Sequence, residues 1–397
     1  MRPAAPGLFL CFLSSAAAAE GPPEVTGQTV RAAMKRAVDF LLADQNPDGS
    51  WGSPRNAAHE FWSNPETHRS WTVATTGLCC MALLEAEETE AVKSAYGRGI
   101  DYLLANAVVK RPSDWDVDNT WAYVYGLQAL ARACANPREP AGSRREEIRR
   151  VGQELIGKLA EYQTPSLGWG YYDFDGYTRP PAWATSFMTA AGVLALLDAK
   201  QAGFDVDSKM LERAVKAVKR CRLPSGAYTY SVEAIPWPRH SEWIDQIKGS
   251  LSRIQVCNLA LHRAGELISR EDLIVGLGHF FDKHRFLDIA RKKPIPHEAY
   301  YLNSGYFYFF GHFYAAGVIE RLPPDEQVKW WPKLRHHVLK TQEKDGSMWD
   351  WYLSSYHKPY GAAYGLMALA RSVAAPAAGL PSAPAVGAPG REAAGGK

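Results

Sequence analysis

Two kinds of helix alternate along most of this chain, and this alternation limits the folds that it can adopt. Helices of the first kind are amphipathic: Val30, Met34, Ala37 and Leu41 lie on one apolar stripe with the helical period. Helices of the second kind are apolar nearly all round and rich in small residues, as in "ATSFMTAAGVLALLDA". A helix that is apolar on every side is buried on every side, so the second kind forms an inner layer and the first kind an outer layer.

The alternation gives six helices of each kind. The outer helices are expected near residues 28–44, 90–106, 144–162, 207–221, 270–285 and 325–342. The inner helices are expected near residues 69–85, 119–134, 184–199, 249–265, 302–319 and 358–372. The sequence therefore predicts an all-α fold, an (α/α)6 toroid of six outer and six inner helices, as one domain over residues 25–373. An open helical solenoid is the alternative, but it would need polar capping repeats at both ends, and the sequence shows none.

The two ends of the chain differ from this helical body. Residues 1–19 carry Arg2, an apolar run at 8–13 and then small residues, a pattern that predicts a secretory signal peptide cleaved before Glu20. A disordered N-terminus is the alternative, and the run is too short to span a bilayer. Residues 374–397 are rich in Ala, Pro and Gly and are expected to be disordered. The predicted location is therefore secreted or periplasmic.

The composition narrows the range of partners. A formal net charge of +3 with 22% charged residues gives no reason to expect nucleic acid as a partner. No later stretch is long and apolar enough to predict a membrane span. Of the six cysteines, Cys11 lies in the predicted signal peptide, and the others have no regular spacing. They are expected to be core residues rather than a disulfide framework, although the sequence leaves open whether one disulfide forms.

A short motif recurs where outer helices end. It reads "FLLADQNPDGSWG" at 40–52, "LAEYQTPSLGWGYY" at 159–172 and "VLKTQEKDGSMWDW" at 338–351. This motif resembles the repeat of squalene and terpenoid cyclases and that of protein prenyltransferase β subunits, and the resemblance implies an α/α toroid. In that family the Gln and Trp chiefly brace the helix ends. A mainly structural role is therefore expected for Gln45, Trp51, Gln163, Trp169, Gln342 and Trp349.

The long connections all run from an outer helix to the next inner helix, so they should meet at one end of the barrel. All 13 tryptophans except Trp330 and Trp331 lie in these connections or in the first inner turn. Aromatic side chains gathered at one mouth predict a pocket for a small molecule, either apolar or carbohydrate. The ligand-binding candidates are Trp115, Trp121, Trp169, Tyr171, Tyr172, Asp173, Trp183, Tyr301, Tyr356 and His357.

The stretch Asp116-Val-Asp118-Asn119, at the start of the second inner helix, resembles the acidic motif of class II terpenoid cyclases. In that family the middle acid protonates an alkene or an epoxide, so the resemblance implies Asp118 as the catalytic acid with Asp116 beside it. An alkene is a weak base, and a neighbouring carboxylate in an apolar cavity keeps such an acid protonated. Asn119 replaces the family's last aspartate, and the second barrel domain of those cyclases is missing. The alternative is that Asp118 or Asn119 only caps the helix.

Metal chemistry is not expected. The stretch "YHKPYGAAYGLMAL" resembles the part of prenyltransferase β subunits that supplies a zinc histidine, and His357 matches it. The Asp and Cys that complete that site are missing, with Ser304 and Tyr306 in their place, so neither a metal nor another cofactor is predicted. His336 and His337 are neighbours on an outer helix, where they should lie on a solvated face rather than bind one metal.

Other functions also fit an exported toroid. Aromatic platforms and paired carboxylates are typical of polysaccharide-acting enzymes. The acids for such a role would be Asp116, Asp118, Asp173, Asp175 and Glu298, with His297, Tyr301 or His240 as a further base or acid. A rigid toroid that binds a hydrophobic ligand or a protein segment without catalysis is another alternative. The preferred prediction is a squalene-cyclase- and prenyltransferase-like repeat protein whose aromatic mouth binds an apolar or ring-bearing ligand, with isoprenoid-cyclase-like acid chemistry as its candidate reaction.

Overall fold

The computed structural model describes residues 25–54, 64–139, 141–176, 178–233, 243–266 and 268–374. The predicted signal peptide lies outside these ranges, as do His240 and all of the predicted tail except Ala374. Within the ranges, no helix combines the length and the apolar character that a bilayer crossing requires.

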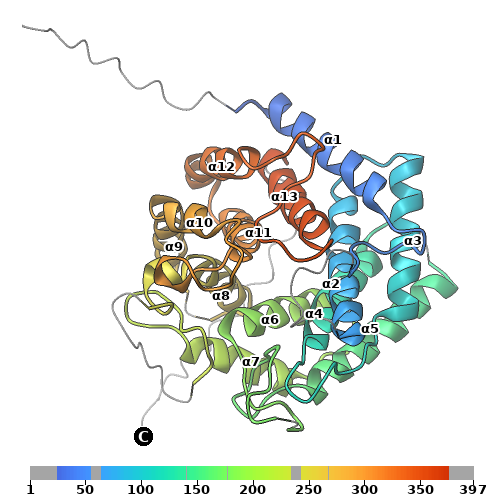
Figure 1. Ribbon diagram of the computed structural model, residues 1–397, viewed down its shortest axis with the longest axis horizontal. Coiled ribbons are helices and arrows are strands. Elements are labelled where there is room, and N and C mark those ends of the chain that lie inside the picture. The colour runs from blue at the N-terminus through green and yellow to red at the C-terminus, as the bar shows by residue number, and fades with distance from the viewer. Residues whose placement is uncertain are drawn as a thin grey trace, which may run out of the picture.

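Two concentric rings of helices make up the described part of the chain (Figure 1). The outer ring consists of α1 (Gly27–Asp44), α3 (Glu90–Asn106), α5 (Ser143–Glu161), α7 (Ser208–Arg220), α9 (Arg270–Asp282) and α12 (Pro324–Leu339). The inner ring consists of α2 (Pro65–Leu84), α4 (Asn119–Ala135), α6 (Ser186–Gln201), α8 (Leu251–Arg263), α11 (Phe307–Ile319) and α13 (His357–Val373). The predicted (α/α)6 toroid is confirmed, and every predicted helix is present.

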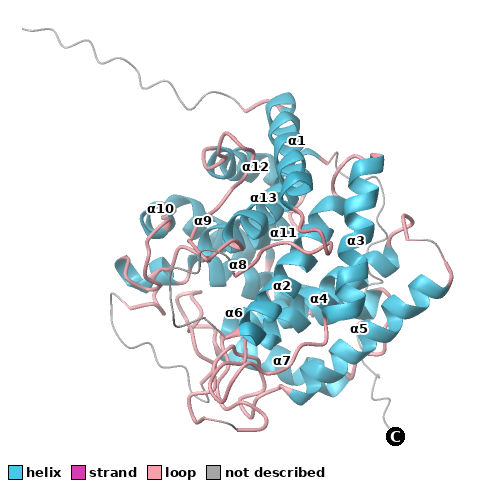
Figure 2. Ribbon diagram, turned by 45° about the vertical axis from the view of Figure 1, so that its right-hand side comes forward, coloured by secondary structure: helices cyan, strands magenta, loops and turns pink. Residues whose placement is uncertain are grey.

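The inner ring is closed. Each inner helix packs against the next one, and α13 packs against both α1 and α2. These contacts join the last pair of helices to the first, which excludes the open solenoid. Figure 2 shows helices joined by loops, and the residues that the structure describes contain no strand. Isolated bridges such as Asp116 to Tyr172 tie neighbouring loops together instead.

Small residues let the inner helices approach each other closely. At Gly77 of α2, a Cβ atom would lie only 2.6 Å from the carbonyl oxygen of Tyr125 in α4, so only glycine fits there.

The cysteines of the described residues are core residues. The free and buried thiols are Cys79, Cys80, Cys134, Cys221 and Cys257, and none forms a disulfide.

The recurring motif braces outer helices against the inner ring. The indole N–H of Trp51 donates to the Leu41 carbonyl of α1, and that of Trp169 donates to the Leu159 carbonyl of α5, both at 2.8 Å. Both tryptophans are fully buried. Each indole therefore satisfies a carbonyl near a helix C-terminus that would otherwise lack a partner.

The third copy of the motif differs from the sequence-based match. Its Gln342 amide donates to the Gly346 carbonyl, which fixes the register of the copy. Two residues after Gly346, it is Met348 that is fully buried. Trp349 instead packs edge-on against His357, with ring centroids 5.2 Å apart. Matching Trp349 to the bracing tryptophan was therefore wrong, because Met348 occupies that place.

Short helices interrupt loops that were expected to be irregular. A short helix, α10 (Arg285–Ala290), follows α9, and 3-10 turns lie at Ile247–Gly249 and Tyr300–Leu302.

The prediction that His336 and His337 both lie on a solvated face was wrong in part. His337 turns inward and stacks on His284, with ring centroids 3.4 Å apart.

Candidate active site

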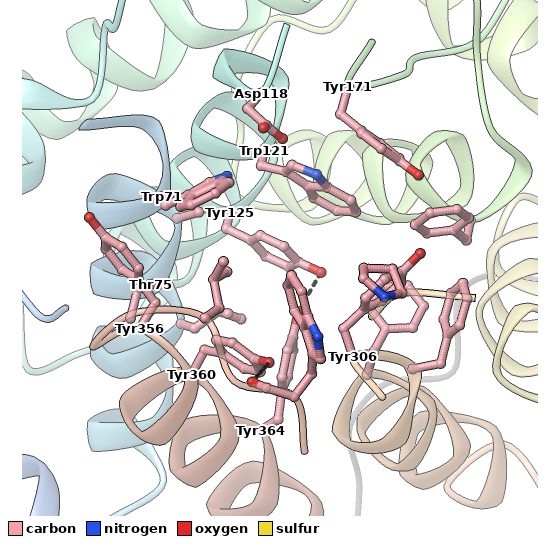
Figure 3. Close-up of a pocket in the computed structure, with 18 of the residues that line it drawn as sticks. Trp71, Thr75, Asp118, Trp121, Tyr125, Tyr171, Tyr306, Tyr356, Tyr360 and Tyr364 are labelled. Atoms are coloured by element: carbon pink, nitrogen blue, oxygen red, sulfur yellow. Dashed lines mark hydrogen bonds between the residues drawn. The ribbon is translucent and has the colours of Figure 1, made fainter. Parts of the chain in front are cut away.

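A cavity of about 270 Å³ opens at the centre of the toroid, among the N-terminal halves of inner helices and the loops that precede them (Figure 3). Helices α2, α4, α6, α11 and α13 all contribute side chains to it. Its lining consists of Trp71, Ala74, Thr75, Leu78, Asp118, Trp121, Tyr125, Tyr171, Tyr172, Phe187, Pro296, His297, Tyr306, Phe307, Phe310, Trp351, Leu353, Tyr356, Tyr360 and Tyr364. Aromatic rings dominate this surface, and Asp118 is the one carboxyl group among the described residues that line it.

The position of Asp118 separates a capping role from a site role. Asp118 stands at the N-cap of α4, yet its side chain makes no capping hydrogen bond. Figure 3 shows the carboxyl group at the edge of the pocket, beside Trp71 and Trp121. A cap would turn its oxygen to the first backbone N–H groups of the helix. The carboxyl group of Asp118 therefore faces the cavity and is not used by the helix.

Asp116 lies directly behind Asp118 and holds the turn in place. Its Oδ1 accepts the backbone N–H of Asp118 at 2.9 Å, and its Oδ2 accepts the hydroxyl of Thr67 from α2. The loop that carries Asp116 is paired with the loop that carries Tyr171, because Val117 N–H donates to the Tyr171 carbonyl at 3.0 Å. The pairing brings the acid motif and the aromatic loop to the same wall of the pocket.

The two carboxyl groups differ in their charge state. Burial raises the pKa of Asp118 well above its usual value, and the neighbouring Asp116 raises this pKa further, against a hydrogen bond with Trp71 that lowers it. Burial also raises the pKa of Asp116, but hydrogen bonds from Thr67 and from the Asp118 N–H favour its anion. Of this coupled pair, Asp118 is therefore the member whose protonated form is favoured more strongly.

Aromatic faces surround the space in front of Asp118. Trp121 stacks on Tyr125, with ring centroids 5.7 Å apart, and lies 6.3 Å from Tyr171. Phe187 lies across from this stack, 6.0 Å from Trp121. The negative face of such rings stabilises a cation that is not solvated by water. The pocket is thus suited to an apolar ligand that becomes positively charged.

A chain of hydroxyl groups ends at a histidine in the same pocket. Tyr171 is hydrogen-bonded to Tyr230, Tyr230 to Tyr306 at 3.1 Å, and Tyr306 to His297 Nε2 at 2.9 Å. His297 Nδ1 donates to the Leu302 carbonyl at 2.7 Å, which leaves Nε2 as the acceptor. Burial lowers the pKa of His297, so the imidazole is neutral and can accept a proton.

Three linked tyrosines cross the barrel, and two of them, Tyr125 and Tyr364, also line the pocket. Tyr364 of α13 donates to the hydroxyl of Tyr125 in α4, and Tyr125 lies 3.4 Å from the hydroxyl of Tyr314 in α11. Burial raises the pKa of all three phenols well above the usual value, so this group is uncharged. The three rings form a neutral floor between opposite inner helices.

The structure brings only part of the predicted site together. The candidates that line the pocket are Asp118, Trp121, Tyr171, Tyr172 and Tyr356. The candidates outside its lining are Asp116, Trp115, Trp169, Asp173, Trp183, Tyr301 and His357. Their local contacts explain why most of the second group lies elsewhere.

Asp173 fastens its own loop. It is fully buried and pairs with Arg111 at 2.9 Å, while it also accepts the backbone N–H and the hydroxyl of Thr178, each at 2.8 Å. Burial alone would raise its pKa, but Arg111 and Thr178 outweigh this effect and lower the pKa. Asp173 is therefore an anion whose acceptor sites are occupied by the protein.

Three tryptophans outside the lining have structural neighbours. Trp169 is the brace described above, and the indole of Trp183 donates to the Ser231 hydroxyl at 3.0 Å. Trp115 is 44% exposed and packs on Tyr172 at the rim. These positions leave the three rings outside the pocket lining, and their role in ligand binding stays a prediction.

Tyr301 and His357 are also held away from the pocket. The hydroxyl of Tyr301 accepts Lys248 Nζ at 2.8 Å. His357 Nδ1 lies 2.7 Å from the Ser354 carbonyl, and burial lowers the pKa of His357 to about 4. His357 is therefore neutral, and its Nδ1 is bound to its own loop.

Much of the lining was missed by the sequence reasoning. It consists of aromatic residues one turn apart on the inner helices, such as Trp121 and Tyr125 on α4, and Tyr356, Tyr360 and Tyr364 on α13. A spacing of four residues places side chains on one helix face. Aromatic pairs with this spacing were the signal that could have located the pocket wall.

Known proteins with this architecture fall into two groups. Residues 15–123 match the model of the squalene-hopene cyclase C-terminal domain. The type II terpene cyclase MstE from Scytonema is 12% identical, with a TM-score of 0.52 over 88% of this chain and 99% of that chain. The α-1,6-mannanase GH76A of Salegentibacter sp. HEL1_6 is also 12% identical, with a TM-score of 0.55 over 86% and 98%. D-mannose isomerase, at 12% identity, gives 0.57 over 89% and 99%.

These similarities define the fold class. The chain has an α/α toroid, as the repeat motif implied, and this fold is similar to that of a type II terpene cyclase. At about one residue in eight identical, the solved structures share architecture with this chain, and the same architecture carries isoprenoid and carbohydrate chemistry. Function must therefore be argued from the pocket.

Proposed function

We propose that the pocket binds an apolar, isoprenoid-type ligand and that Asp118 protonates a carbon–carbon double bond or an epoxide of this ligand to start a cyclisation. One observation carries the proposal: the pocket has an aromatic lining in which Asp118 is the acid, backed by a second carboxyl group that keeps it protonated. A strong, neutral acid in a water-poor cavity is what a weakly basic alkene needs.

The proposed reaction is balanced without any further reagent. The π electrons of the alkene form a new C–H bond with the Asp118 proton, which leaves a carbocation on the ligand and a carboxylate on Asp118. The faces of Trp121 and Phe187 stabilise the cation while rings close. Loss of a proton from carbon, with His297 Nε2 as the acceptor through Tyr306, ends the reaction as an isomerisation.

Asn119 sets this pocket apart from the family motif. Only Asp116 remains to repel the anion of Asp118, because the third acid is an amide. With less repulsion, less of Asp118 is in the protonated form, so we expect a substrate that is protonated more readily than an unactivated alkene, such as an epoxide.

The polysaccharide alternative lacks its second acid. Glycoside hydrolysis uses two carboxyl groups on opposite sides of the bond, about 5–9.5 Å apart. Among the described residues, the pocket lining holds Asp118 alone, while Asp173 is paired with Arg111 outside the lining. Non-catalytic binding of an apolar ligand would use the same aromatic wall and differs from the proposal only in turnover.

The test uses a panel of linear polyprenes, polyprenols and their epoxides, incubated with the purified protein in D2O and followed by mass spectrometry. The proposal expects cyclised products, which carry one non-exchangeable deuterium on carbon where an alkene was protonated and none where an epoxide oxygen was protonated. Asp118→Asn should abolish conversion, and Asp175→Asn, on an exposed carboxylate of the neighbouring loop, should retain it. Equal conversion by Asp118→Asn would sink the acid role.

Two other outcomes identify the alternatives. Quenching of tryptophan fluorescence by a polyprene without any product would establish a binding toroid. Release of reducing ends or unsaturated sugars from a polysaccharide panel would establish the carbohydrate enzyme.

We also infer export from the N-terminal pattern of residues 1–19, and a single folded domain over 25–373 followed by a disordered tail. Sequencing the N-terminus of the mature protein from its native source tests the first inference. A mature chain that begins near Glu20 is expected, and one that retains Met1 would contradict export. Limited proteolysis should trim residues after 373 and leave the toroid intact.

A further inference from the structure

Histidines from three helices meet in a cluster on the outer side of the toroid, apart from the pocket. His284 stands at the start of α10, with Asp288 one turn later, His312 lies on α11 and His337 on α12. Ligand atoms of His284, Asp288 and His337 all lie within 4.8 Å of one another. No sequence pattern predicts this cluster, because its residues come from separate segments of the chain.

A hydrogen-bond chain fixes which nitrogen of His284 is free. His312 Nδ1 lies 2.7 Å from the Tyr308 carbonyl and must donate to it, so His312 Nε2 carries a lone pair. His284 Nε2 lies 3.1 Å from this lone pair and must donate to it. The lone pair of His284 Nδ1 then faces Asp288 Oδ2 at 3.0 Å. A proton on His284 Nδ1 or a metal ion satisfies both acceptors, so this position can hold a cation.

His337 supplies a third donor atom beside this pair. Its Nδ1 is buried and has no hydrogen-bond partner among the described residues. A buried nitrogen without a partner is unfavourable, and a rotation of this ring breaks no existing bond of Nδ1. Asp288 is held from its other side, because its Oδ1 accepts Lys340 Nζ at 2.8 Å. Oδ2 is thus turned toward His284 and His337.

We propose that His284, Asp288 and His337 bind a divalent transition-metal ion, with zinc the ion that this donor set fits best. Two imidazoles and a carboxylate are zinc ligands, and the outer partners match the pattern that orients metal-bound histidines. His312 and the Tyr308 carbonyl position His284, and Lys340 positions Asp288. Asp288 and His337 are partly exposed, so an ion reaches the site from solvent.

Such an ion would join two segments of the outer layer. His284 and Asp288 belong to α10, and His337 to α12. The expected role is therefore structural: the ion fixes α10, and with it the loop after α10 that carries His297 to the pocket rim. The site and the proposed cyclisation are independent, because no metal ligand lines the pocket.

The test uses untagged protein that has been stripped with a chelator and titrated with zinc by calorimetry. The proposal expects about one equivalent of zinc and a higher Tm with zinc than without it. Asp288→Asn and His337→Gln should each weaken zinc binding at least tenfold, while His336→Gln, the adjacent histidine of the same helix, should bind as the wild type does.

Cobalt substitution gives a second readout that does not depend on stability. A tetrahedral or five-coordinate cobalt spectrum is expected for the wild type and for His336→Gln, and its loss is expected in His337→Gln. No zinc binding by folded wild-type protein would overturn the proposal. Equal zinc affinity in all three variants would overturn it as well.

Discussion

Asp118 and Asp173 are two buried carboxyl groups at the same mouth of the barrel, and their pKa values are shifted in opposite directions. Asp173 is surrounded by donors, namely Arg111 and the hydroxyl and N–H groups of Thr178, which lower its pKa. Asp118 faces aromatic rings and has Asp116 behind it, which together raise its pKa. The comparison shows that burial alone does not decide the role of an acid. The hydrogen-bond donors and charges around the carboxyl group decide it.

The largest effect should follow from removing the two acids separately. Asp118→Asn should lower turnover by about 10²–10⁴-fold or more, the usual contribution of a general acid, and leave the fold intact. Asp173→Asn should leave the turnover per folded molecule unchanged and reduce the stability of the fold instead. Product formation and circular dichroism on the same samples separate the two effects, and equal loss of turnover in both variants would break the comparison.

Removing the partner of Asp173 should have the next largest effect. Arg111→Met leaves a buried anion unpaired, and breaking such a pair costs about 3–5 kcal/mol. Urea denaturation measures the change in the free energy of unfolding. The double variant Arg111→Met with Asp173→Asn should recover part of the loss, because no buried charge is left. A loss under about 1 kcal/mol for the single variant would place the pair among weakly coupled surface ion pairs.

The charge state of Asp118 predicts a characteristic dependence of stability on pH. The folded pKa is raised, so the folded protein binds one proton more than the unfolded chain between the unfolded pKa, about 3.9, and the raised pKa. In this window the stability of the wild type should fall with rising pH, relative to Asp118→Asn, by about 1.4 kcal/mol per pH unit. Chemical denaturation of both proteins at several pH values checks the slope. Parallel curves would mean that Asp118 is already ionised.

Turnover should also depend on the protonation of Asp118. It should decline as pH rises through the raised pKa of Asp118, since only the protonated form donates. Asp116→Asn removes a repelling neighbour, so the alkaline decline should move to lower pH. The pH profiles of the two proteins give this shift, and an unchanged or higher midpoint would contradict the role of Asp116.

The smallest effect concerns the aromatic wall. Trp121→Phe keeps an apolar ring but has a weaker attraction for cations, a difference of about 0.5–1 kcal/mol. Turnover should drop a few-fold while binding of an uncharged polyprene, followed by calorimetry, stays nearly constant. Equal losses in binding and turnover would indicate packing rather than stabilisation of a cation.

The fold was predictable because its signal is repeated along the chain. Apolar residues with a 3.6-residue period and helices without a polar face define the two rings, and the tertiary structure does not override them. Asp118 was found through its motif. Its raised pKa was predictable in part, because Asp116 stands two residues away, but the burial that is the largest cause depends on side chains from other helices, such as Trp71 and Phe187.

The rest of the site depends on contacts that the sequence does not display. Tyr301 and His357 were assigned to the mouth by their place in the loops, and local hydrogen bonds turn them away. His337 differs from His336 only by one step of about 100° around the helix, and this rotation decides which ring meets His284. A sequence pattern predicts which face of a helix is buried. The residues that contact this face from other helices are determined only when the ring of helices is assembled.

The three hydroxyl-linked tyrosines have a kinetic consequence. Because the hydroxyl groups of Tyr125, Tyr314 and Tyr364 meet between inner helices, we expect the three rings to close the inner end of the cavity, so that ligand and product both pass through the mouth. A flexible chain can thread into such a cul-de-sac, but the rigid ring system made from it must leave through the same opening. Release of the product should therefore limit the steady-state rate, and a burst of product in the first turnover would reveal it.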